Sequence, residues 1–117
     1  MYCPILLIIL ASLVITIHAD ELYSDKYDGL DIDGILANEE LRKQHENCYM
    51  DRGPCDDAAE FFKSHFPEVV ATACSKCTEW QSQAFDKIAD WYNKNDEATW
   101  NAFVANNMEL AKTMNIR

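Results

Sequence analysis

The feature that most constrains this chain is a set of four cysteines with the spacing C-x6-C-x18-C-x2-C. Cys48 and Cys55 flank a Gly53-Pro54 turn, and Cys74 and Cys77 lie about one helical turn apart. Four cysteines allow three pairings, which the sequence alone leaves open. Residues this close along the chain keep their Cα atoms within disulfide reach. We therefore interpret the set as two local disulfides, Cys48–Cys55 and Cys74–Cys77.

The same cysteines could instead serve redox chemistry or bind zinc. A redox-active C-x-x-C pair belongs in a β-α-β setting, which the helical pattern of this chain does not provide. A zinc site usually spaces its paired ligands by about two to four residues, and the gap between the first two cysteines is longer. We therefore expect structural disulfides, no metal and no cofactor.

Residues 1–19 contain no Asp, Glu, Lys or Arg and end at Ala19, just before Asp20. A membrane span needs about 20 apolar residues, so this segment is better interpreted as a cleaved secretory signal, although its start lacks the usual Lys or Arg. Cleavage would remove Cys3 and leave four cysteines for the oxidising extracellular route. We expect one secreted domain, residues 20–117, in lymph or haemolymph, with no membrane insertion after cleavage.

The charge balance is strongly acidic, because 20 Asp and Glu oppose 10 Lys and Arg for a net charge of −10. An acidic chain repels nucleic acid and anionic membrane surfaces, so neither is expected as a partner. The simpler interpretation of the charge is a well-solvated exterior. We expect a monomer.

Apolar residues recur at helical intervals and no run alternates with period two, so the sequence predicts an all-α fold of five to six short helices. The predicted helix N-caps are Asp31, Asn38, Asp57 and Asp96. Pro67 is expected to end one helix or to begin the next.

An extended arm with aromatic residues at Tyr23 and Tyr27 is followed by a short helix with Ile32, Ile35 and Leu36 on one face, and a later segment bears Phe61, Phe62 and Phe66. Three further helical stripes are predicted. The first stripe contains Leu41, His45 and Cys48. The second is the strongest and consists of Val70, Ala73, Cys77, Trp80, Ala84, Phe85, Ile88, Trp91 and Tyr92. The third belongs to the last helix and consists of Trp100, Phe103, Val104, Ala111 and Met114.

Signals for catalysis are weak. Only two histidines follow residue 19, His45 and His65, and no G-x-S-x-G, H-E-x-x-H or calcium-loop spacing accompanies them. The carboxylates are scattered over presumed outer faces rather than paired as an acid and a base. We therefore do not expect an enzyme.

Three Trp, five Tyr and five Phe are many large rings for a small helical chain. Short helices that meet at angles can leave an aromatic-lined cavity for an apolar ligand. Alternatively, the rings can fill the core completely. Periodicity alone favours the filled core.

The cysteine spacing, with Tyr27-Asp28 ahead of it, resembles that of the insect chemosensory proteins. The resemblance continues through Asp51-Arg52-Gly53-Pro54-Cys55, Cys74-Ser75-Lys76-Cys77-Thr78-Glu79 and Gln81 to Trp100. It implies a secreted helical carrier with sequential local disulfides. The apolar channel of such a carrier binds long-chain fatty acids or alcohols, odorants or pheromone-like molecules. With this resemblance, the cavity becomes the favoured interpretation.

The resemblance also implies which residues meet the ligand: Tyr27, Asp28, His45, Phe62, Gln81 and Trp100. The aromatic members would supply apolar contact area, and Gln81 could hydrogen-bond the polar head of the ligand. Burial of a C12–C18 chain at about 25 cal/mol per Å² would give roughly micromolar affinity after the costs of association. The family's usual C-terminal Tyr-Asp-Pro segment has no counterpart here, so we expect a smaller or more open channel.

Two alternatives stay open. His45 stands where the family usually has an aromatic residue, and its protonation in mild acid would weaken ligand binding if it lines the channel. A structural or exposed histidine would have no such effect. The alternative to the carrier is a secreted interaction protein with a filled core, acting in development or immunity, which would bind no displaceable hydrophobic probe.

Overall fold

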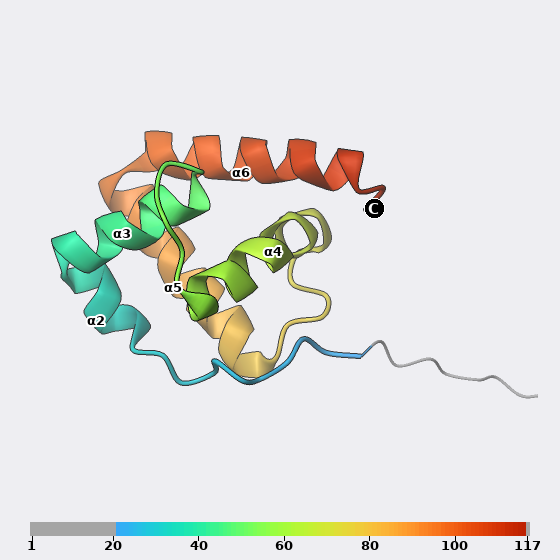
Figure 1. Cartoon of the computed structure of the whole chain (residues 1–117), viewed down its shortest axis with the longest axis horizontal. Coiled ribbons are helices and arrows are strands. Elements are labelled where there is room, and N and C mark those ends of the chain that lie inside the picture. Colours follow the sequence, from blue (N-terminus) through green and yellow to red (C-terminus); the bar gives the residue numbers. More distant parts are fainter. Residues whose placement is uncertain (1–20, 117) are drawn as a thin grey trace, which may run out of the picture.

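The computed structural model describes residues 21–116, so the predicted signal segment lies outside the described residues. The described part contains five helices and no strand, which confirms the all-α prediction (Figure 1). The helices are α2 (Ile32–Ala37), α3 (Glu39–Tyr49), α4 (Asp57–Thr72), α5 (Glu79–Asn95) and α6 (Glu97–Thr113). In residues 21–116, no helix is both long and apolar enough to cross a membrane.

Short-range capping explains where most helices begin. Asp31, Asn38 and Asp96 cap α2, α3 and α6 as predicted, each accepting a hydrogen bond from the backbone N–H three residues later. The prediction for α4 was wrong by one residue, because Asp56 rather than Asp57 accepts from Ala59 N at 2.8 Å. Asp57 then lies in the first helical turn, where a carboxylate still favours the helix dipole.

The prediction that Pro67 ends a helix was also wrong, since α4 continues through it to Thr72. A proline in a helix interior costs about 3 kcal/mol because it removes one backbone hydrogen bond and crowds the preceding turn. Here Phe66, Pro67 and Val69 are all buried, and α4 packs against α6. This burial outweighs the cost of the proline. The ribbon of α4 changes direction between its two halves, as proline kinks do (Figure 1).

The stripe expected to run on from Val70 is interrupted by left-handed backbone. Ala73 and Cys74 have φ of 52° and 65°, and their N–H groups donate to Val69 O in a helix-ending arrangement. Ala73 is consequently exposed rather than inward. The chain then passes through the Cys74–Cys77 disulfide before Thr78 and Gln81 form the capping box that begins α5.

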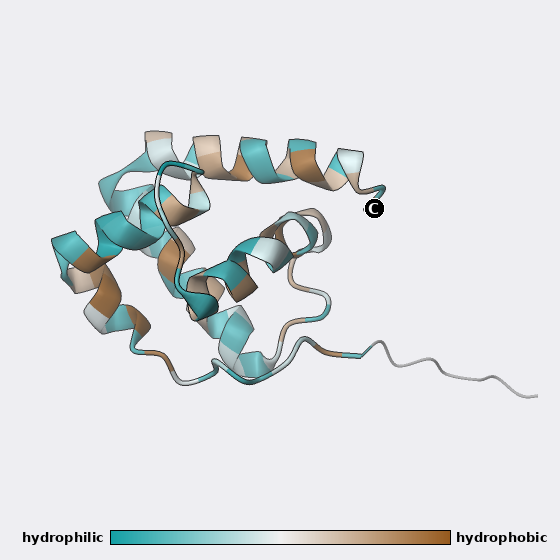
Figure 2. Ribbon diagram, viewed as in Figure 1, coloured by the Kyte–Doolittle hydropathy of each residue, from teal (hydrophilic) through white to brown (hydrophobic). Residues whose placement is uncertain are grey.

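Both predicted disulfides are present, with Cα–Cα distances of 5.1 Å for Cys48–Cys55 and 5.0 Å for Cys74–Cys77. Helix α6 runs along one side of the molecule and packs on α4 and α5, while α2 packs on α3 and α5 (Figure 1). Hydrophobic positions recur at intervals along α4 and α6, and the loop after α3 is mainly hydrophilic (Figure 2). Two residues predicted to face inward, Leu41 and Met114, are 40% and 55% exposed.

Candidate ligand-binding site

The helices surround a partly open cavity of about 110 Å³, beside a second of about 50 Å³. The larger is lined by the N-terminal arm and by α2 to α5, and the smaller by α3 to α6. Six residues contribute to both walls, so the two cavities are neighbouring chambers. The shared residues are Glu46, Tyr49, Phe66, Phe85, Ile88 and Tyr92.

Aromatic rings pack against one another around these chambers, in edge-to-face and tilted pairs. Phe66 meets Tyr49 at a centroid distance of 4.8 Å and Phe103 at 5.1 Å, while Trp100 lies 5.6 Å from Phe85. Such ring pairs hold one another in defined orientations. The walls therefore offer a large apolar area whose shape is set by ring packing, as is typical of small-molecule pockets.

Four of the six predicted ligand-binding residues line a chamber, and two do not. His45, Phe62 and Gln81 line the larger chamber, and Trp100 lines the smaller. Tyr27 belongs to neither lining. It packs against Phe62 with ring centroids 6.1 Å apart. Its role as a ligand contact stays a prediction, and in this geometry it braces a wall residue.

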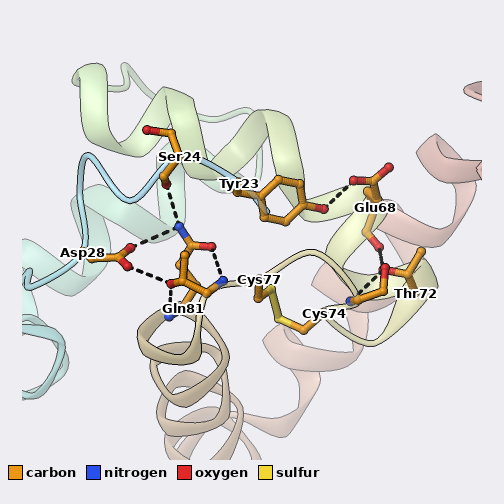
Figure 3. The surroundings of a disulfide bond; sticks show 10 residues. Tyr23, Ser24, Asp28, Glu68, Thr72, Cys74, Cys77 and Gln81 are labelled. Atoms are coloured by element: carbon orange, nitrogen blue, oxygen red, sulfur yellow. Dashed lines mark hydrogen bonds between the residues drawn. A yellow bond between two sulfur atoms is a disulfide. The ribbon is translucent and has the colours of Figure 1, made fainter. Parts of the chain in front are cut away.

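Asp28 also lies outside both linings and accepts two hydrogen bonds from the start of α5 (Figure 3). The Thr78 hydroxyl donates to Asp28 Oδ2 at 2.7 Å, and Gln81 Nε2 donates to Asp28 Oδ1 at 3.1 Å. Gln81 Nε2 also donates to Ser24 O at 2.9 Å, and Gln81 Oε1 accepts from Thr78 N at 3.0 Å. Both donors of the Gln81 amide thus have acceptors within the protein. This side chain ties the N-terminal arm to α5, and its hydrogen bond to a ligand head stays a prediction.

Tyr23 of the N-terminal arm lines the larger chamber. Its hydroxyl donates to Glu68 Oε1 at 2.6 Å (Figure 3). Its ring stacks on His65 at a centroid distance of 4.4 Å, and its N–H donates to Lys76 O at 2.9 Å. Burial, followed by the hydrogen bond to Glu68, raises the pKa of the Tyr23 hydroxyl, so it remains a donor. Burial lowers the pKa of His65, against the opposing effect of the Glu68 carboxylate. Sequence reasoning placed Tyr23 in the arm but did not assign it to the site.

The inward stripe of α3 differs from the predicted one. Residues 42, 45, 46 and 49 face the larger chamber, so Arg42, Glu46 and Tyr49 accompany His45 there. These positions follow the helical pattern i, i+3, i+4, i+7. Because most of these side chains are polar, a search for apolar periodicity does not find them. His45 Nδ1 lies 3.3 Å from the Tyr49 hydroxyl. The proposed effect of His45 protonation on binding stays a prediction.

Glu46 is the buried charge of this site, with 8% of its side chain exposed. Its Oε1 accepts from the Tyr92 hydroxyl at 3.1 Å, and its Oε2 lies 3.3 Å from Lys43 Nζ and 3.5 Å from Arg52 Nη2. Burial, followed by the negative charge of Glu46, raises the pKa of Tyr92, which keeps this hydroxyl a donor.

The profile of the insect pheromone-binding family A10/OS-D matches residues 23–115. The chain belongs to this family. Among the relatives of this A10/OS-D chain, ejaculatory bulb-specific protein 3 of Drosophila melanogaster is 33% identical over 96 residues, which are 82% of this chain and 75% of the relative. Allergen Tha p 1 of Thaumetopoea pityocampa is 38% identical over 68 residues, which are 58% of this chain and 54% of the relative.

Solved structures of this family share the fold. A chemosensory protein in complex with bromo-dodecanol superposes with a TM-score of 0.70 at 34% identity, covering 73% of this chain and 85% of the other. The antennal chemosensory protein A6 of the moth Mamestra brassicae superposes with a TM-score of 0.60 at 30% identity, covering 81% of this chain and 97% of the other.

Proposed function

We propose that the protein is a secreted, monomeric carrier that encloses small hydrophobic ligands in its two chambers. The ligand class is long-chain alcohols and fatty acids, odorants or pheromone-like molecules. The observation that carries this proposal is the pair of adjoining, ring-lined chambers in the interior of an A10/OS-D family chain. A related chemosensory protein was solved in complex with bromo-dodecanol, which supports the same class of ligand here.

In this proposal Phe62 and Trp100 contact the apolar chain of the ligand from opposite chambers, and His45 contacts it from α3. Tyr27, Asp28 and Gln81 hold the arm and the wall in place. Burial of apolar surface at about 25 cal/mol per Å² provides the driving force. The ring packing already present reduces the ordering cost of binding.

Native mass spectrometry of residues 20–117 before and after addition of a C16 alcohol tests the proposal. We expect a protein mass four hydrogens below the reduced chain, as two disulfides require, and a 1:1 adduct with the alcohol. The oxidised mass without an adduct, with this alcohol and with others from C12 to C18, would contradict the carrier and favour the interaction protein.

A matched pair of variants localises the binding. Ile88 lines both chambers, so Ile88→Phe should fill their junction and reduce the adduct about tenfold or more. Leu110 is 41% exposed on α6, so Leu110→Phe adds the same kind of ring outside and should leave binding unchanged. Equal binding by both variants would place the ligand elsewhere.

A further inference from the structure

The buried carboxylate of Glu46 lies where the two chambers meet. It contributes to both walls, together with Tyr92, whose hydroxyl donates to Glu46 Oε1 at 3.1 Å. A charged side chain is rarely buried in an apolar wall, because removing it from water is costly unless partners compensate. A ligand that occupied both chambers would lie against the shared wall to which this group belongs.

The two oxygens of Glu46 have different surroundings. Oε2 meets Lys43 and Arg52, whose side chains are 50% and 57% exposed, so this oxygen faces the solvent side of α3. Oε1 meets Tyr92, which is buried and lines both chambers. A carboxylate oxygen can accept about two hydrogen bonds, and the structure provides Oε1 with one. Among residues 21–116, no second donor contacts Oε1, and Glu46 lines both chambers.

The other charged side chain in the wall of the larger chamber is Arg42, whose guanidinium contacts residues of α2 and α5. Its Nη1 donates to Leu36 O at 2.7 Å, and its guanidinium lies 4.3 Å from the centroid of the Trp91 ring. These contacts hold the positive charge against α2 and α5. The charge that borders both chambers is therefore negative.

We propose that Glu46 makes the cavity selective for long-chain ligands with a neutral hydroxyl head and against those with a carboxylate. The hydroxyl of an alcohol donates to Glu46 Oε1, whereas a carboxylate has no proton to donate and would place its negative charge beside this oxygen, whose partner is the neutral Tyr92 hydroxyl, while Lys43 and Arg52 contact only Oε2. An ester or aldehyde head gains no hydrogen bond and binds between the two. This selectivity rests on the proposed carrier function and narrows its ligand class.

Competition with a neutral fluorescent probe, N-phenyl-1-naphthylamine, tests the selectivity. Dodecan-1-ol and dodecanoate have the same chain length, and both are measured against the protein at pH 7.5, where the acid is ionised. A hydrogen bond to a charged group together with avoided repulsion predicts that the alcohol displaces the probe at a concentration about tenfold or more below that of the acid.

Three variants assign the effect to the carboxylate. Glu46→Gln keeps the size of the side chain and removes its charge. Dodecanoate should therefore bind more tightly, and the preference for the alcohol over the acid should shrink to about twofold or less. Tyr92→Phe removes the donor on Oε1 but keeps the carboxylate, so the preference for the alcohol should persist. Glu109 is 73% exposed on α6, and Glu109→Gln removes one surface charge as a control that should leave the preference unchanged. Circular dichroism and the thermal midpoint verify that each variant is folded.

Each outcome decides between distinct explanations. Equal displacement by alcohol and acid, with the probe bound, overturns the selectivity but leaves the carrier function. A preference for dodecanoate overturns it in favour of Arg42 as the head-group partner. Persistence of the alcohol preference in Glu46→Gln shows that another group selects the ligand. Failure of the wild type to bind the probe or either ligand overturns the carrier function and the selectivity together.

Discussion

His65 illustrates how the wall of the cavity changes the chemistry of a single residue. Its ring lies between Tyr23 at 4.4 Å and Phe61 at 4.5 Å, and it lines the larger chamber. Burial among these rings lowers the pKa of His65, because an imidazolium would lose hydration there. The neighbouring Glu68 opposes this effect without reversing it. The folded protein therefore favours the neutral imidazole.

This residue should make stability depend on pH in mild acid. The unfolded imidazole takes up a proton near pH 6.5, and the folded one does so only at lower pH. The contribution of His65 is therefore complete above pH 6.5 and is lost as the pH falls through 6.5 towards the folded pKa. Urea unfolding at pH 7.5 and pH 5.0 should show a larger loss for the wild type than for His65→Gln. Equal losses would contradict the lowered pKa.

The end of α4 shows what one element requires of its backbone. The helix ends because Ala73 and Cys74 adopt left-handed conformations that turn the chain into the Cys74–Cys77 disulfide. An alanine in this conformation is strained by its Cβ by roughly 1–2 kcal/mol, and a glycine is not. The strained turn places both cysteines of the disulfide in the wall of the larger chamber.

Replacing Ala73 by glycine should therefore stabilise the protein. We expect Ala73→Gly to raise the free energy of unfolding by about 0.5–1 kcal/mol, after the larger entropy of glycine in the unfolded chain is subtracted. Ala102, exposed within α6, provides the opposite control, since Ala102→Gly should lower it by about 1 kcal/mol. Urea unfolding with the disulfides intact measures both. A loss of stability in Ala73→Gly would show that the Cβ makes a contact worth more than the strain.

In the molecule as a whole, the division of the interior into two chambers depends on rings contributed by several helices. Phe85 of α5 is central to this division, because it lines both chambers and meets Phe66 at 6.5 Å and Trp100 at 5.6 Å. Helices α4, α5 and α6 must all be in place for these rings to meet. The length of chain that the protein can enclose is thus a property of the assembled fold.

Replacing Phe85 by a smaller side chain should join the chambers and shift the preferred ligand length. We expect Phe85→Leu to move the affinity maximum to longer alcohols in a C10 to C18 series, at a cost of about 1–2 kcal/mol in stability. Phe61 lines only the larger chamber, so Phe61→Leu should leave the maximum nearly unchanged. Probe displacement by the alcohol series measures both variants. The same maximum in Phe85→Leu and the wild type would show that the ring does not limit ligand length.

Local features of this protein were predictable because their causes lie within a few residues. The caps Asp31, Asn38 and Asp96 each accept a hydrogen bond from the backbone N–H three residues later. Each disulfide joins cysteines at most seven residues apart. Helical periodicity already predicted that His45 and Trp100 face inward, and resemblance to a family pointed to these two together with Phe62 and Gln81 as wall residues.

Features that depend on distant partners followed no local rule. Pro67 stays within α4, where it is buried and the helix packs on α6. The amide nitrogen of Gln81 donates to Ser24 and Asp28 of the arm, more than 50 residues earlier in the chain. Glu46 faces the chambers because Tyr92, Lys43 and Arg52 satisfy its charge. The amino-acid order alone thus predicted most helices and caps and favoured the two local disulfides, because the energies of these features are short-range. Tertiary packing decided which faces are buried and where a charge meets the cavity, since burial energy depends on every element that surrounds a side chain.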